Sequence, residues 1–167
     1  IWHKPNPMPE SVRDRCTKAH EYLFLLSKSE RYYFDSEAIQ EPAAEPDRKR
    51  CDRIGGANGH LVRHSLGGIV GSSVTRNRRS VWSIPTQPYS GAHFAVMPEA
   101  LVKPCILAGS PLDGTVLDPF AGSGTVLACA RWLGRRHVGI ELNPSYCELI
   151  RARLAERAHL FEDASTQ

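Results

Sequence analysis

The chain has 167 residues, of which 41% are hydrophobic and 23% charged, and a formal net charge of +3 at pH 7. This composition fits one globular domain and excludes a fibrous or disordered chain. No run reaches the roughly 18 apolar residues of a membrane span, and no signal-peptide pattern is present, so we expect a soluble, cytoplasmic protein without a membrane partner. The five cysteines are odd in number and lack a Cys-x-x-Cys pair, which disfavours a disulfide framework and a zinc ribbon.

The first part of the chain alternates between proline-rich and apolar stretches. Residues 1–10 open with an apolar pair and then hold three prolines within five positions, which predicts a loop that leaves a strand. Residues 20–26 form an apolar run of strand length, and after the polar residues 27–30 the aromatic residues 31–35 form another. We therefore expect a β-hairpin built from residues 20–26 and 31–35.

Residues 43–80 differ in composition from the rest of the chain. They hold six of its 13 glycines and eight of its 21 lysines and arginines, with few residues that could build a core. This pattern predicts a mobile basic insertion, and it leaves contact with DNA phosphates and base edges and a solvated linker equally open. Cys51, His60 and His64 are too few and too scattered to indicate a metal site, so none is expected. The residues assigned to DNA are Arg48, Lys49, Arg50, Arg76, Arg78 and Arg79.

Two elements are expected after the insertion. Residues 79–85 predict a strand that returns to the core. Pro98 and Glu99 indicate the start of a helix, because proline fits a first helical position and an acid suits the positive end of the helix dipole. Pro104 is expected to bend or divide this helix. Its expected buried face consists of Leu101, Val102, Cys105, Ile106 and Leu107.

A strand, a glycine turn and a helix are predicted next. Residues 114–118 form a short apolar run of strand type, and residues 126–133 predict a helix. Gly122 and Gly124 lie between the two. Glycines let a backbone approach a ligand where a Cβ would clash, and the following helix offers free N–H groups. This pattern is typical of a cofactor-binding turn.

A second strand is predicted at residues 135–141. It ends in Glu141, 23 residues after Asp118. An acid at about this spacing commonly binds the ribose hydroxyls of a nucleoside cofactor. Asn143 and Pro144 then predict the cap and the first position of another helix.

The eight residues from Asp118 to Thr125, Asp-Pro-Phe-Ala-Gly-Ser-Gly-Thr, resemble the S-adenosylmethionine loop of the DNA methyltransferases that act on adenine N6 or cytosine N4. A dinucleotide fingerprint fits less well, because Leu127 stands where its third glycine belongs. The resemblance implies an α/β fold, part of a Rossmann-like class I methyltransferase sheet, with S-adenosylmethionine as cofactor. A structural turn in another α/β protein is the alternative. The resemblance assigns the cofactor to Asp118, Phe120, Gly122, Gly124, Thr125, Glu141 and Asn143.

The resemblance to these methyltransferases extends along most of the chain. Residues 1–42 resemble part of the catalytic half and include the expected hairpin. Residues 43–80 occupy the place of the target-recognition region, and residues 81–167 that of the cofactor-binding half. The resemblance therefore implies double-stranded DNA as the partner; it does not indicate an oligomeric state.

A catalytic tetrapeptide, (Asp/Asn/Ser)-Pro-Pro-(Tyr/Phe/Trp), is characteristic of this family, and the 167 residues do not contain it. It orients an extruded base. Residues 143–146, Asn-Pro-Ser-Tyr, imitate it, but they follow the second strand of the sheet rather than the fourth, and too few residues remain for two more strand–helix units. We therefore expect no catalytic residue in this chain, which would be a C-terminal portion with the tetrapeptide upstream of Ile1.

Three functions remain open at this point. The first is a DNA methyltransferase for adenine N6 or cytosine N4, which this portion alone would not catalyse. The second is a nicotinamide-dependent oxidoreductase, against which the absent third glycine counts. The third is a non-catalytic DNA-binding module with a vestigial cofactor pocket.

Overall fold

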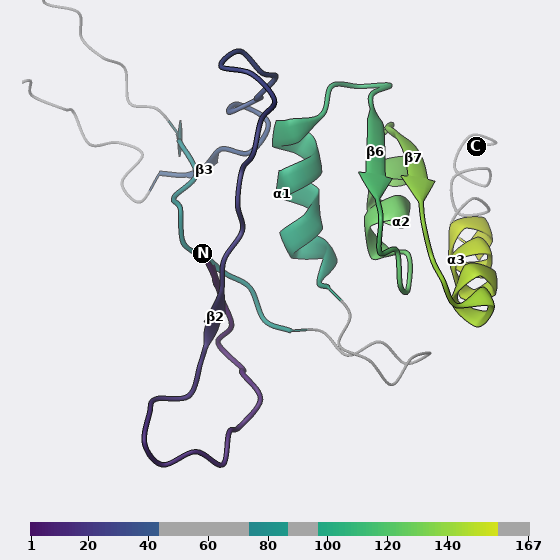
Figure 1. Cartoon of the computed structure of the whole chain (residues 1–167). Coiled ribbons are helices and arrows are strands. Elements are labelled where there is room, and N and C mark those ends of the chain that lie inside the picture. The colour runs from purple at the N-terminus through teal and green to yellow at the C-terminus, as the bar shows by residue number, and fades with distance from the viewer. Residues whose placement is uncertain (44–73, 87–96, 157–167) are drawn as a thin grey trace, which may run out of the picture. The chain divides into compact units, whose positions relative to one another are not determined.

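The computed structural model describes residues 1–43, 74–86 and 97–156. Contacts divide the chain into two units, one made of Ile1–Ile39 and Arg79–Gln167 and the other of Gln40–Arg78. The described elements of the larger unit are β1 (Trp2–His3), β2 (His20–Glu21), β5 (Trp82–Ser83), α1 (Glu99–Gly109), β6 (Thr115–Asp118), α2 (Thr125–Trp132), β7 (Arg136–Gly139) and α3 (Pro144–Glu156) (Figure 1).

Strands β6 and β7 pair in parallel, with Thr115 opposite Arg136 and Asp118 opposite Gly139. Parallel neighbours need a crossover connection, and α2 provides it. The strand, glycine turn, helix and second strand expected from the sequence are therefore confirmed, with ends that differ by one or two residues. The backbone N–H of Ile140 donates to the Asp118 carbonyl at 2.9 Å and continues the pairing beyond β7.

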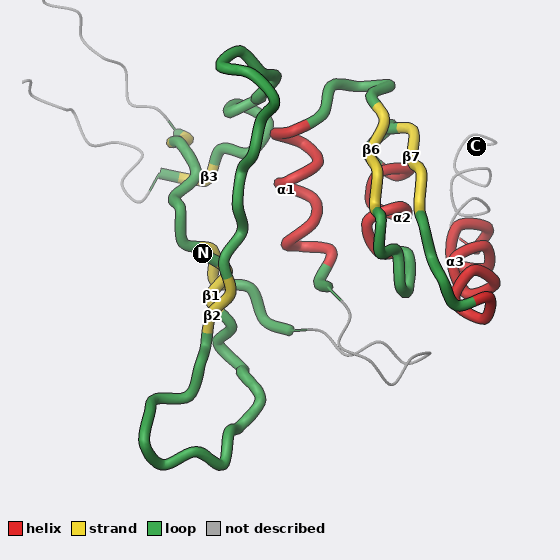
Figure 2. The backbone as a smooth tube through the Cα atoms, viewed as in Figure 1, coloured by secondary structure: helices red, strands yellow, loops and turns green. Residues whose placement is uncertain are grey.

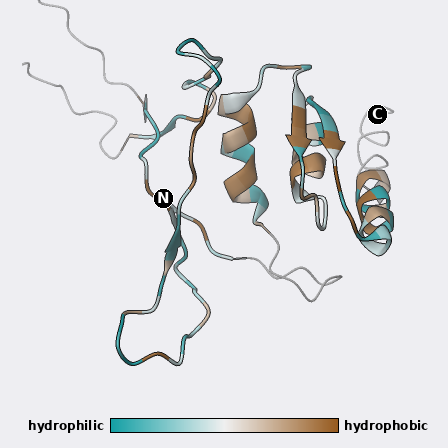
Figure 3. Ribbon diagram, in the orientation of Figure 1, coloured by the Kyte–Doolittle hydropathy of each residue, from teal (hydrophilic) through white to brown (hydrophobic). Residues whose placement is uncertain are grey.

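The main core lies where α1 and α2 pack beside β6. Val102 and Ile106 of α1 pack with Cys129 and Ala130 of α2, both of which are fully buried. Val116 of β6 packs against the same cluster. Figure 3 shows apolar stretches along both helices and both strands. No helix of the described residues is long and apolar enough to cross a membrane.

Helix α1 is not divided at Pro104, which rules out one of the two outcomes expected from the sequence. Proline lacks the N–H that would bond to the preceding turn, which weakens a helix interior. Pro104 is itself buried, and buried residues precede and follow it along the helix. Packing on both sides of the proline therefore keeps the eleven residues of Glu99–Gly109 in one helix.

A three-stranded sheet joins the first residues of the chain to those before α1. β1 pairs antiparallel with β2 and parallel with β5, with Trp2 opposite Trp82 in the second pair. Trp2 is 6% exposed and packs with Ile84 and Leu101, and its Nε1–H donates to the Ile84 carbonyl at 2.7 Å. The strand expected at residues 79–85 is confirmed as β5, and β1 is a strand that ends before the proline-rich loop, as expected.

The expected hairpin of residues 20–26 and 31–35 is wrong. Only His20–Glu21 is a strand, and its partner is β1. Figure 2 shows the following segment, up to β3, as loop. Between the two runs, the Ser27 hydroxyl donates to the Ser29 carbonyl at 2.7 Å, a local bond that competes with a hairpin ladder. Aromatic content gave these runs a strand signal, but strands also need a partner and a buried face, and Phe24 is 79% exposed.

The smaller unit contains a two-stranded antiparallel sheet. Its strands are β3 (Glu41–Pro42) and β4 (Thr75–Arg76), and Glu41 lies opposite Arg76. The Arg76 guanidinium makes a salt bridge to the Glu41 carboxylate at 2.9 Å. Most of the expected basic insertion, including Arg48, Lys49 and Arg50, lies outside the described residues.

Candidate functional site

The glycine turn connects the end of β6 to α2. The Asp118 carboxylate accepts the backbone N–H of Phe120 at 3.1 Å, which begins the turn directly after the strand. Gly122 has a φ of 51° and Gly124 a φ of 75°, in the left-handed region that glycine adopts without strain. The Gly124 N–H donates to the Ala121 carbonyl at 2.7 Å and closes the turn. Phe120 is 89% exposed, so the turn presents its ring to solvent.

Glu141 follows β7 and lies against the same turn. Its Oε2 accepts the Gly122 N–H at 2.8 Å, and its Oε1 accepts the Asn143 N–H at 2.9 Å. These backbone hydrogen bonds, from Asn143 first and Gly122 second, hold the pKa of the Glu141 carboxyl below its ordinary value of 4.5. The carboxylate is therefore ionised at neutral pH, and each oxygen keeps a lone pair for a further donor.

Gly139 of β7 was not among the predicted site residues, although it determines how closely α2 approaches the strand. A Cβ at Gly139 would lie 2.4 Å from Cδ1 of Leu127. In dinucleotide-binding turns, the third glycine permits such close packing from the helix. In this chain Leu127 of α2 stands at the position of that third glycine. The residue without a side chain is instead Gly139, on strand β7. No local pattern marks Gly139, because its importance depends on the packing of Leu127 from α2.

The side chains of Thr125 and Asn143 have partners within the protein. Thr125 is 4% exposed, and its hydroxyl accepts a hydrogen bond from Arg153 Nη1 at 3.0 Å. Asn143 Oδ1 accepts the Ser145 N–H at 3.0 Å, as a helix cap does. The predicted start of α3 at Asn143 and Pro144 is therefore confirmed. Arg153 was not predicted to belong to the site.

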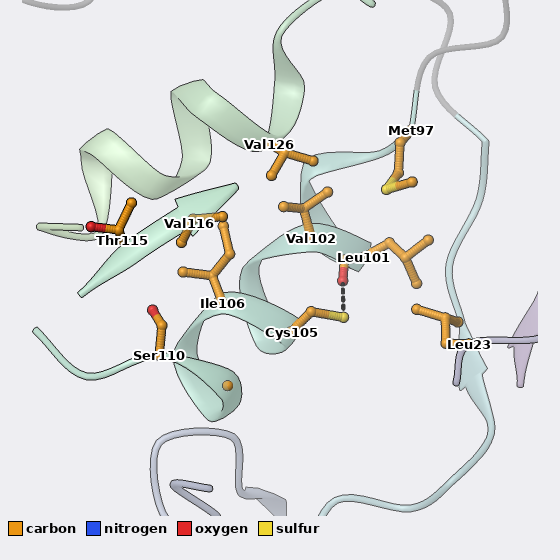
Figure 4. Close-up of a pocket in the computed structure, with 11 residues that line it drawn as sticks. Leu23, Met97, Leu101, Val102, Cys105, Ile106, Ser110, Thr115, Val116 and Val126 are labelled. Atoms are coloured by element: carbon orange, nitrogen blue, oxygen red, sulfur yellow. Dashed lines mark hydrogen bonds between the residues drawn. The ribbon is translucent and has the colours of Figure 1, made fainter. Parts of the chain in front are cut away.

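An apolar pocket of about 310 Å³ lies beside α1. Figure 4 shows Val102 and Ile106 of α1 close to Val116 and Val126, with Leu23 at the far end. None of the predicted cofactor residues lines this pocket. Its lining offers hardly any polar groups to orient a nucleoside, so the pocket and the glycine turn are different sites.

The residues predicted to contact DNA are only partly described. Arg76 is paired with Glu41, which occupies its guanidinium. Arg78 is partly buried and Arg79 is exposed, just before β5. No group of three or more metal-ligating side chains occurs among the described residues, and the dismissed Cys51, His60 and His64 lie outside them. The assignments to cofactor and DNA remain predictions at this point.

Comparison with protein families identifies the chain. The sequence model of the DNA methylase family of N6 and N4 enzymes matches residues 1–152, a range that contains the glycine turn, Glu141 and Asn143. The chain belongs to this N6/N4 DNA methylase family. The family predicted from the eight residues Asp118 to Thr125 is therefore confirmed.

Individual relatives show how much of such a methylase this chain spans. It is 47% identical to the Type II methyltransferase M.SmaI of Serratia marcescens, over 94% of this chain and 45% of the relative. It is 46% identical to the Type II methyltransferase M.Cfr9I of Citrobacter freundii, over 92% of this chain and 42% of the relative. The chain therefore spans less than half the length of these relatives.

A solved structure supports the fold. The complex of M1.HpyAVI with S-adenosylmethionine aligns with 92% of this chain and 59% of that chain, at a TM-score of 0.53 and 20% sequence identity. The α/β fold expected from the sequence is therefore confirmed as that of a DNA methylase. Only the expected hairpin is not part of it.

Proposed function

We propose that this chain forms the cofactor-binding part of a DNA methyltransferase that transfers a methyl group from S-adenosylmethionine to an exocyclic amino group, adenine N6 or cytosine N4. Family membership supports the class of enzyme. The observation that carries the cofactor assignment is the Glu141 carboxylate, which the N–H groups of Gly122 and Asn143 hold beside the glycine turn.

The turn fits an adenosyl cofactor. A Cβ at Gly122 would have no neighbour closer than the Phe120 carbonyl oxygen at 3.9 Å, so this side of the turn is open to a ligand. The free lone pairs of Glu141 suit two ribose hydroxyls. Asp118, Phe120 and the two glycines line the sugar and methionine side. Bound S-adenosylmethionine supplies an electrophilic methyl group on its sulfonium.

Thr125 and Asn143 support the cofactor indirectly. The Thr125 hydroxyl accepts a hydrogen bond from Arg153. Thr125 therefore contributes as the first residue of α2, directly after the turn. The Asn143 backbone N–H holds Glu141, while its side chain caps α3. Both residues therefore shape the site without offering a free side chain to the ligand.

Double-stranded DNA is the partner in this proposal, and residues 43–80 are its target-recognition region. Arginine side chains there would meet phosphates and base edges. Arg76, which makes a salt bridge to Glu41, belongs to the proposed DNA-binding set together with Arg78 and Arg79. We also assign Arg48, Lys49 and Arg50 to DNA contact, because they are positively charged.

The catalytic step needs residues that this chain does not contain. Methylation of an amino group requires an extruded base, held on an aromatic face and oriented by acceptors. The 167 residues have no Pro-Pro pair, so the family tetrapeptide must come from elsewhere in the protein. Its absence here favours a second candidate, a DNA-binding module that keeps a cofactor site but transfers no methyl group.

A labelling experiment separates the two candidates. The full-length protein is incubated with double-stranded DNA and S-adenosylmethionine that carries a radioactive methyl group, and the nucleosides are then separated by chromatography. Label in N6-methyladenine or N4-methylcytosine supports the methyltransferase and identifies the target base. Cofactor and DNA binding without labelled nucleosides would support the non-catalytic module instead.

A further inference from the structure

Arg153 of α3 joins the glycine turn to two helices. Its side chain is only 11% exposed. Nη1 donates to the Ser123 carbonyl at 3.2 Å and to the Thr125 hydroxyl at 3.0 Å, and Nη2 donates to Glu99 Oε1 at 3.3 Å. These partners lie 30, 28 and 54 residues away in sequence. One side chain therefore connects the turn, the start of α2 and the start of α1.

The chemistry of this contact requires an arginine. A nearly buried cation is costly unless it is paired and hydrogen-bonded, and Glu99 supplies the opposite charge. The planar guanidinium has five donors in fixed directions, so it bonds to several acceptors at once. A lysine would place one ammonium group at the same site and could not keep all three contacts in this geometry.

The turn needs such contacts because of its glycines. Ser123 lies between Gly122 and Gly124, and glycine loses more backbone freedom on ordering than any other residue. On one side of the turn, Glu141 accepts the Gly122 N–H. On the other side, Arg153 binds the carbonyl of the next residue, Ser123. Two charged side chains thus hold the backbone of two consecutive residues of the turn.

We propose that Arg153 is a positioning residue of the cofactor site: it holds the glycine turn in its binding conformation and links the turn, through Glu99, to the start of α1. Arg153 acts through the turn and does not contact the cofactor. Ordering the turn in advance strengthens binding, because the ligand then loses less free energy to ordering. The inference rests on the proposed function, since it requires that this turn bind S-adenosylmethionine.

The test measures S-adenosylmethionine binding to the full-length protein by calorimetry. We expect Arg153→Ala to raise the Kd about tenfold, as for the loss of a charged hydrogen-bonding network. The matched control is Arg151→Ala, on the same helix but exposed, which should leave the Kd unchanged. In methylation assays, Arg153→Ala should raise the KM for the cofactor while kcat at saturating cofactor stays close to that of the wild type. A merely structural role would lower the amount of active protein and leave KM unchanged.

Two further variants keep the proposal testable if Arg153→Ala does not fold. Thr125→Val removes one acceptor but preserves the shape of the side chain, and Arg153→Lys preserves the charge. Each should raise the Kd by less than Arg153→Ala, about two- to fivefold. An unchanged Kd in both folded variants would overturn the positioning role.

Failure of this inference differs from failure of the proposed function. If Glu141→Ala weakens cofactor binding while folded Arg153→Ala does not, the cofactor site is correct and the role of Arg153 is wrong. If neither variant changes the affinity, the cofactor does not bind at this turn, and both proposals fail.

Discussion

The backbone N–H of Gly122 donates to Oε2 of Glu141 at 2.8 Å, across 19 residues of sequence. This hydrogen bond joins the two features that the sequence singled out, the glycine turn and the acid after the second strand. Glu141 therefore has two roles in this proposal. One lone pair of Oε2 accepts the hydrogen bond from the turn, and the other remains for a ligand. Loss of the carboxylate should therefore affect both cofactor binding and the conformation of the turn.

Replacement of Glu141 by alanine is expected to weaken S-adenosylmethionine binding about tenfold to a hundredfold, because it removes a charged acceptor of the ribose hydroxyls. Calorimetric titration of the full-length protein measures the change. Glu148→Ala is the matched control, since Glu148 is exposed on α3, and it should bind as the wild type does. Equal affinities for Glu141→Ala and the wild type would disprove the ribose assignment.

The pKa of Glu141 predicts how the stability of the turn depends on pH. Because the folded protein lowers this pKa, the stabilising contribution is fully present above the ordinary value of 4.5 and is lost as the pH falls through the folded pKa. The free energy of unfolding of the wild type should therefore exceed that of Glu141→Gln at neutral pH, and the difference should shrink below pH 4.5. Urea denaturation of both proteins over this range measures it; a difference independent of pH would contradict the prediction.

Gly139→Ala should destabilise the protein by about 1 to 3 kcal/mol, because overpacking of a core costs this much. The new Cβ would lie 2.4 Å from Cδ1 of Leu127, which is 4% exposed and has little room to move. The control is Gly109→Ala at the end of α1, where a Cβ has no neighbour within 4 Å. That variant should be neutral or up to about 1 kcal/mol more stable. Urea midpoints of the two variants in the wrong order would refute the packing role of Gly139.

The basic residues before β5 can be tested through the salt dependence of DNA binding. Arg78→Ala combined with Arg79→Ala should reduce the slope of log K against log salt by up to about 2, one for each phosphate that the double variant no longer neutralises. Arg76→Ala removes one further cation, which is paired with Glu41, and should reduce the slope by at most about 1. Filter binding at several salt concentrations measures the slopes, and S-adenosylmethionine affinity serves as the control. Should the double variant keep the wild-type slope, these arginines do not bind phosphates.

Local sequence signals predicted the cofactor-side fold well. The turn residues, the following helix and the acid lie within one βαβ unit, where glycine, proline and cap chemistry act over a few positions. Asn143 and Pro144 illustrate this, because a cap depends on immediate neighbours and was placed correctly. The position of Glu141 beside the turn was also accessible, since one helix and one strand separate the two in sequence.

Long-range contacts were not predictable in the same way. The aromatic runs around Phe24 gave a strand signal, but pairing is decided by the partner, and His20 pairs with His3 instead. Arg153 lies on α3, and only the fold brings it to Ser123, 30 residues earlier. Gly139 was overlooked because its importance depends on Leu127, which comes from another element.

The last prediction concerns catalysis. The 167-residue chain alone should transfer no methyl group to DNA, even at saturating cofactor, because it contains nothing that can orient an extruded base. The only similar stretch, Asn143 to Tyr146, begins α3; Asn143 Oδ1 is bonded to the Ser145 N–H and Pro144 is the first helical residue. The full-length protein should be active, and mutation of a proline-proline-aromatic motif outside this chain should abolish that activity. Methylation by the 167 residues alone that Tyr146→Ala abolishes would instead make this stretch the catalytic loop.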